Sequence, residues 1–249
     1  MRAAVLAAFL VVPTATAQDA ALLMAFDQGR YEEAARLDLP KTADELAFAA
    51  RAVLAQCMTG PHEPSEGEIT RGQSLAREAL ELDPGHIEGR LQLAIALSLK
   101  MRPMSSIQAH RSGHGGEVRD LARSVLDDDP GNAYAHGLLA VWNIEVLRRG
   151  GRIGAAMMGA DLKSARAHYQ AAIQSAPTDA SIHWQYARAL AALNAKRHGD
   201  DIAAALTAAT SAPLETALER TMAERATHFS QALDVLGPRE AERLAREML

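Results

Sequence analysis

The sequence predicts an all-α protein made of repeated helical hairpins, and three observations lead to this prediction. The chain has 249 residues, of which 52 are alanine, whereas aromatic residues make up only 4%. Alanine is the strongest helix former and strands favour aromatic and β-branched side chains, so the composition favours helices over a β-sandwich. In addition, prolines recur at similar intervals along the chain, and an alanine stands ten residues after each of them. Such a recurrence is typical of a repeat protein.

The prolines and alanines set the register of the repeat. The prolines are Pro40, Pro84, Pro130, Pro177 and Pro213, and the alanines are Ala50, Ala94, Ala140, Ala187 and Ala223. Proline cannot continue a helix, because its ring clashes with the preceding turn and it lacks an N–H, so each proline marks the end of one helix. After Pro84, Pro130 and Pro177 the chain offers Gly-His, Gly-Asn and Thr-Asp-Ala to begin the next helix. The small alanine on the third turn of that helix then lets its neighbour approach closely.

The expected helices follow in order. Helix-forming stretches cover 43–58, 86–101 and 133–148, and they are followed by Gly- and Pro-rich breaks at 59–67, 102–116 and 149–159. Within 86–101, the stretch 91–99 alternates as a strand would, but its leucines and alanines favour a helix. Near the end, an apolar stripe over 214–236 predicts a helix that Gly237-Pro238 terminates. Residues 239–249 predict a short amphipathic helix, which we expect to cap the stack.

This pattern resembles the tetratricopeptide repeat (TPR) family, whose 34-residue helix–turn–helix units stack into a right-handed superhelix. The family has a small residue at its eighth position, where this chain has the five alanines. It has a proline at its thirty-second position, where this chain has the five prolines. Its alanine at the twenty-seventh position corresponds to Ala79, Val125, Ala172 and Ala208. The resemblance covers residues 18–236. The first three intervals, of 44, 46 and 47 residues, exceed 34 by ten to thirteen, so three repeats carry an insertion between their two helices. The family's first-helix aromatic appears once, as Trp184. In stacked repeats the three breaks would emerge along one rim.

The beginning of the chain has the layout of a secretory signal peptide. A basic Met1-Arg2 start precedes an apolar run over 3–12, and Ala15-Thr16-Ala17 provides small residues for cleavage before Gln18. An uncut anchor helix is the alternative, but ten apolar residues cover only about 15 Å, half of a bilayer core. We therefore expect a signal peptide at 1–17, a single TPR-like domain at 18–249, no stable membrane anchor, and a periplasmic or secreted location. The single cysteine, Cys57, lies among apolar residues and is expected to be buried and inert.

The sequence gives no sign of catalysis. It has no P-loop, no His-Glu-x-x-His, no Gly-x-Ser-x-Gly and no Cys-x-x-Cys. A formal net charge of −5 argues against a nucleic-acid-binding protein. His110 and His114 are spaced so that they could hold a metal on a helix, but solvent-exposed histidines of a Gly- and Ser-rich loop explain them better, so we predict no metal and no cofactor. The chain is therefore predicted not to be an enzyme.

Stacked hairpins present a concave groove, so the prediction for function is a scaffold that binds a protein or peptide partner through that groove or the loop rim. The residues expected to contact the partner are His136, His183, Trp184, Ile153, Met157 and Met158. Each of these residues also has a purely structural interpretation. The two histidines would be buried and hydrogen-bonded, Trp184 would pack in the core, and the loop with the two methionines would pack onto its own rim. The alternative function is small-ligand binding, as in the exported helical subunit of tripartite periplasmic transporters, which is similar to divergent TPRs.

Overall fold

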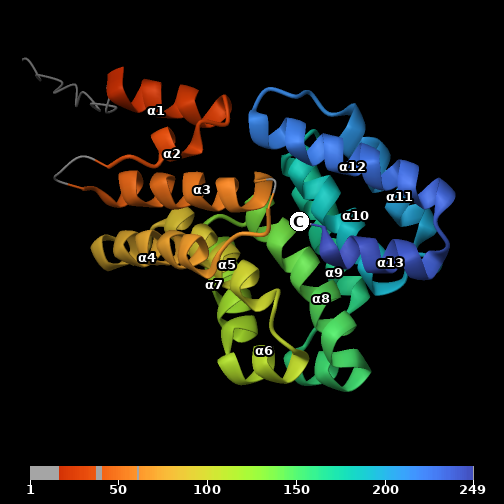
Figure 1. The fold of residues 1–249 in the computed structure, drawn as a ribbon. Coiled ribbons are helices and arrows are strands. Elements are labelled where there is room, and N and C mark those ends of the chain that lie inside the picture. Colours follow the sequence, from red (N-terminus) through yellow and green to blue (C-terminus); the bar gives the residue numbers. More distant parts are fainter. Residues whose placement is uncertain (1–16, 38–40, 61, 249) are drawn as a thin grey trace, which may run out of the picture.

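The computed structural model describes residues 17–37, 41–60 and 62–248, and within these ranges the protein is all-helical, with no strand (Figure 1). The helices are α1 (Ala17–Asp27), α2 (Tyr31–Ala34), α3 (Ala43–Thr59), α4 (Glu66–Leu82), α5 (Ile87–Met101), α6 (Ser106–Ser112), α7 (His114–Asp128), α8 (Ala133–Met158), α9 (Leu162–Ser175), α10 (Ala180–Asn194), α11 (Gly199–Ser211), α12 (Ala217–Val235) and α13 (Pro238–Glu247). The predicted all-α class is confirmed. Residues 1–16 of the predicted signal peptide lie outside the described residues.

The residues that follow Pro84, Pro130 and Pro177 cap the next helix, as the sequence predicts. His86 accepts a hydrogen bond from the backbone N–H of Gly89 through Nδ1, and the Asn132 side chain accepts one from Ala135. Asp179 accepts from the first two N–H groups that it can reach in α10. Since the first turn of a helix has no internal partners for its N–H groups, these side chains define where α5, α8 and α10 begin.

The five recurring alanines lie in alternate helices, namely α3, α5, α8, α10 and α12, and none is more than 4% exposed. Along the chain, neighbouring members of this set pack against each other, α3 against α5 and α10 against both α8 and α12. Four residues, in α4, α7, α9 and α11, correspond by sequence to the twenty-seventh position of the TPR family. Three of them, Ala79, Val125 and Ala172, are fully buried, but Ala208 is only half-buried. In α11 the buried stripe runs through Ile202, Ala205, Leu206 and Ala209 instead, so the predicted register is one residue off there.

Two of the three predicted breaks are largely helical, which corrects the expectation of long loops. Residues 60–65 do separate α3 from α4, but 102–116 contains α6 and the start of α7. The stretch 149–159 continues α8 as far as Met158, with a kink at Gly151, where φ is 60° and ψ is −165°. Only glycine adopts this backbone conformation readily, so Gly151 makes a sharp kink between two helical segments of α8.

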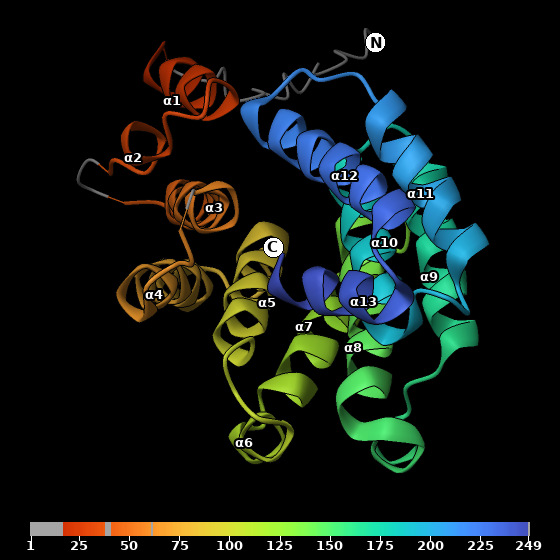
Figure 2. The same ribbon diagram turned by 45° about the vertical axis from the view of Figure 1, so that its right-hand side comes forward.

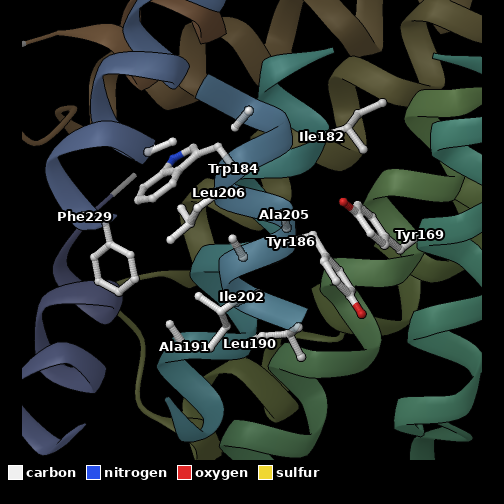
Figure 3. Packing of buried hydrophobic residues seen from close by; sticks show 14 of the residues in the cluster. Tyr169, Ile182, Trp184, Tyr186, Leu190, Ala191, Ile202, Ala205, Leu206 and Phe229 are labelled. Carbon is white, nitrogen blue, oxygen red and sulfur yellow. The ribbon is translucent and has the colours of Figure 1, made fainter. Parts of the chain in front are cut away.

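The largest hydrophobic core lies between α8, α10, α11 and α12. Figure 3 shows Trp184 and Phe229 facing each other in it, with ring centroids 5.8 Å apart, and Ile202 and Leu206 beside them. On the other side of α10, Tyr169 and Tyr186 are stacked with centroids 3.8 Å apart. A second core joins α1 to α5 with α7 and α8. Phe26 and Tyr31 meet edge to face in it, with ring centroids 5.3 Å apart. Alanines dominate both cores and let the helices approach closely.

The last helices return to the first ones. Helix α12 contacts α1 and α3, and Arg225 donates a hydrogen bond from its guanidinium to the Met58 carbonyl at the end of α3. Helix α13 lies inside the curve that the other helices form, between α5 and α10 (Figure 2). It packs mainly on α10 and only slightly on α12. The sequence predicts that this helix caps the stack; the turn at Gly237-Pro238 folds it back onto α10.

Candidate functional site

Two of the residues predicted to meet a partner are well placed for it. Ile153 and Met157 lie in the last part of α8, beyond the kink at Gly151, and their exposed fractions are 79% and 73%. Ile107 on α6 is also strongly exposed. The end of α8 and α6 lie at the same end of the molecule in both ribbon views (Figures 1 and 2). Exposed large apolar side chains on a rigid helix are suited to contact with another protein.

Met158, the third residue predicted at this rim, packs inward instead. It is half-buried against the second core, and its terminal methyl lies near Gly115 in α7. Its carbonyl accepts a hydrogen bond from Arg119, whose guanidinium also lies over the Trp142 ring. Met158 therefore holds the end of α8 against α7, and it leaves Ile153 and Met157 as the exposed apolar pair of the rim.

His136 belongs to a pair of histidines between α8 and α9. Its Nδ1 lies 2.9 Å from Nδ1 of His168, and its Nε2 lies 3.0 Å from the Pro130 carbonyl. A carbonyl can only accept, so Nε2 of His136 carries a proton and donates it, and Nδ1 accepts from His168. Burial, followed by the nearby charges of His136 and Arg123, lowers the pKa of His168. The pair ties α8 to α9.

His183 and Trp184 are buried in the core, so in this conformation they have no surface for a partner. His183 repeats the contact of His136, with Nε2 2.9 Å from the Pro177 carbonyl, and its Nδ1 accepts from the Tyr169 hydroxyl at 2.6 Å. Trp184 is fully buried. The structural alternative thus describes both residues, and the structure does not bring them together with Ile153 and Met157.

The inner side of the curve carries a group of charged residues that the sequence analysis did not single out. Arg102 follows α5, Arg148 and Arg149 lie on α8 with Glu145 one turn before them, and Arg188 lies on α10. We call these five residues the inner arginine cluster. Glu145 accepts from Arg148 at 2.6 Å and lies 3.5 Å from Arg149. Arg188 is only 5% exposed although it lies in an otherwise apolar stretch of alanines and leucines.

The four guanidinium groups affect one another. Burial, and then the positive charge of Arg188, lowers the pKa of Arg102 to about 10. Burial likewise lowers the pKa of Arg188, while Glu145 opposes this effect. Burial alone would raise the pKa of Glu145, but the charges of Arg188, Arg148 and Arg149 outweigh it and lower that pKa. The cluster therefore places four arginines around Glu145 in a partly desolvated place, and Glu63 is a second carboxylate that acts on Arg102.

Backbone carbonyls accept many of the hydrogen bonds that the guanidinium groups of the cluster donate. Arg149 donates to the carbonyls of Met101 and Arg102 at the end of α5. Arg102 donates to the Met248 carbonyl at 2.9 Å, and Arg188 to that of Ala245 at 3.3 Å. Both α5 and α13 thus direct their carboxyl ends, which carry a partial negative charge, at the cluster. The one signal in the sequence that could have revealed the cluster is Arg188 itself, a lone charge inside the apolar stretch 187–193.

Three further findings bear on function. Among the described helices, none combines the length and apolar character that a membrane span requires. Cys57 is buried, and burial raises the pKa of its thiol to about 11, which agrees with the inert thiol predicted from the sequence. No family model matches the chain, and no curated protein matches it either.

Proposed function

We propose that the protein is an exported, non-catalytic scaffold of TPR-like hairpins that binds a protein or peptide partner. The observation that carries this proposal is the packing of five helices with a buried alanine at an equivalent place: α3 packs on α5, and α10 packs on both α8 and α12, whereas α5 and α8 contact each other only slightly. A stack of hairpins presents a long surface from rigid elements. The TPR-like superhelix, the export and the partner are parts of this proposal.

The rim formed by Ile153 and Met157 is the surface that is open to a partner in this conformation. The inner face offers less room, because α13 covers part of α10. Exposed isoleucine and methionine side chains give apolar contact area, and methionine adapts to different surfaces because it is flexible and polarisable. The predicted contact residues on the rim are therefore Ile153 and Met157, and we no longer include the buried Trp184 and His183 in that surface.

Photo-crosslinking in the native cell envelope tests this function. A crosslinkable amino acid at position 153 or 157 should yield a discrete adduct, whereas the same group at the exposed Lys163 of α9 should not. Substituting the other rim residue with serine should reduce the adduct at least fivefold while the melting temperature stays within a degree or two. If the adduct is unchanged by the substitution, the rim is not the binding surface. If a small molecule co-purifies and no protein is captured, the small-ligand alternative replaces the proposal.

A further inference from the structure

Helix α13 is held on α10 by few side chains. Only Ala241 and Ala245 of this helix are buried, and they are small. Leu244 and Met248 are half-buried against the largest hydrophobic core. Hydrogen bonds to the main chain add to this attachment: Arg246 donates to the Ala192 carbonyl at 3.2 Å, and Glu242 accepts from the Ala195 N–H at 3.3 Å. These apolar residues are spaced along one face of a helix, so a partner segment with the same spacing makes the same contacts with α10.

The contacts that α13 does make at its carboxyl end are with cations. Arg102 directs one nitrogen at the carbonyls of Arg246, Glu247 and Met248, and Arg188 reaches that of Ala245. These carbonyls carry only partial negative charge, of about half an elementary charge for a whole helix end. The four arginines of the inner arginine cluster face two carboxylates, Glu145 and Glu63, so the end of α13 leaves part of their positive charge uncompensated.

We propose that the inner arginine cluster is a binding site for an acidic, helix-forming segment of a partner, and that α13 occupies this site within the chain until the partner displaces it. The proposal rests on the proposed role in partner binding and names a second surface for it. The partner segment would lie along α10 where α13 lies now. Its carboxylates would stand where the carbonyls of residues 245–248 stand.

The physical reason for the exchange is the difference between a carbonyl and a carboxylate as acceptor. Hydrogen bonds from guanidinium to carboxylate are charge-assisted, shorter and roughly twice as strong as those to neutral acceptors, and the forked guanidinium pairs with both oxygens of a carboxylate. The site is partly desolvated, which strengthens such pairs relative to bulk water. A segment with the small-residue face of α13 and an acidic end therefore fits the site better than α13 itself.

The test uses two fluorescein-labelled, amidated peptides. One has the sequence of residues 238–248, and the other has the same sequence followed by three glutamates. Because the tethered α13 competes at an effective concentration on the order of millimolar, the full chain is studied alongside its Ala245→Leu variant, which overpacks the contact of α13 with α10. Fluorescence anisotropy should show the acidic peptide binding the variant at least tenfold more tightly than the plain peptide does. It should bind the unsubstituted chain at least tenfold more weakly than it binds the variant.

Arginine substitutions then assign the binding to this cluster. Arg102→Gln and Arg188→Gln, each combined with Ala245→Leu, should weaken the acidic peptide at least tenfold and the plain peptide less than threefold. Arg77→Gln on α4, far from α10 along the stack, is the matched control and should change neither. Arg102 is half-buried, so its variant remains informative if substitution of the buried Arg188 impairs folding, which circular dichroism would show.

Two results would overturn the proposal. The first is that neither peptide binds the Ala245→Leu chain, or that the acidic peptide binds it independently of both arginines. The second concerns the unsubstituted chain. When the acidic peptide saturates this chain, hydrogen exchange of the amides of residues 239–248 should become faster. Exchange that stays the same or becomes slower would show that α13 is not displaced. Either failure leaves the crosslinks at 153 and 157 unaffected, so it can be distinguished from failure of the proposed scaffold function.

Discussion

At the scale of single residues, alanine decides how closely the helices pack. Ala94, Ala140 and Ala187 have no exposed surface, and each lies where its helix meets a neighbour. A larger side chain there has no room unless the backbones move apart. Since protein interiors are packed as densely as crystals, such a shift affects the whole joint.

We expect Ala140→Leu to destabilise the protein by about 1–3 kcal/mol, because three extra carbon atoms must be fitted into a filled joint. Ala203→Leu makes the same change on an exposed position of α11 and should alter the free energy of unfolding by less than about 0.5 kcal/mol. Urea unfolding of both variants measures the difference. Equal midpoints would show that Ala140 is not a point of close approach.

The histidine pair makes the stability depend on pH. The pKa of His168 is lower in the folded protein than in the unfolded chain, so below about pH 6.5 the unfolded chain binds more protons. Its contribution is fully present above that pH and is lost progressively as the pH falls toward the folded-state pKa. His198, whose pKa burial also lowers, acts in the same direction.

The expected result is a lower free energy of unfolding at pH 5 than at pH 7.5. His168→Gln keeps a donor for Nδ1 of His136 but cannot titrate, so its stability should fall less over that interval. The exposed His62→Gln is the control and should follow the unsubstituted chain. Identical pH dependence in all three proteins would contradict the role given to His168.

At the scale of elements, the structure shows that a glycine-rich stretch need not be a loop. Residues 150–159 contain four glycines, yet α8 continues through them. The positive φ values of Gly151 and Gly159 mark the kink and the end of the helix, while Gly154 has ordinary helical geometry between them. The glycines thus shape the path of α8, and this path brings Ile153 and Met157 to the surface.

Two alanine substitutions separate these roles. Nothing lies within 4 Å of the Cβ position at either Gly151 or Gly154, so only the backbone decides the outcome. Gly151→Ala should destabilise by about 1–3 kcal/mol, because its backbone region is nearly closed to other residues. Gly154→Ala should instead stabilise by about 0.5–1 kcal/mol, since alanine favours the helix. Thermal unfolding would reveal the opposite signs, and shifts of equal sign would rule out the kink.

At the scale of the whole molecule, α12 near the end of the chain contacts α1 near its beginning. Arg220 of α12 donates a hydrogen bond to the Asp27 carbonyl at the end of α1 at 3.4 Å, and Gly29 is so close to Ala217 that a Cβ there would lie 2.9 Å from that side chain. The first and last hairpins therefore meet, and α13 lies inside the curve. The orientation of the inner face depends on this closure.

The proposed export makes a prediction about the complete chain. If 1–17 is a signal peptide, N-terminal sequencing of the protein recovered from the envelope should begin at Gln18, within two residues. The physical reason is that the apolar run over 3–12 suits the export machinery but is too short to span a bilayer. Recovery of the protein from the cytosol with Met1 intact would contradict the proposal.

Periodic features of the sequence were sufficient to predict the helical class, the helices 43–58, 86–101 and 214–236 to within a few residues, and the burial of the five alanines. These properties depend on local interactions: proline stops, capping side chains and the spacing of small residues act within a turn or two of helix. The place of α13, the inner arginine cluster and the burial of Trp184 were decided by tertiary structure. Each depends on contacts between residues far apart in the chain, such as Arg102 with Met248 or Trp184 with Phe229, and no local pattern specifies which distant surface a helix will meet.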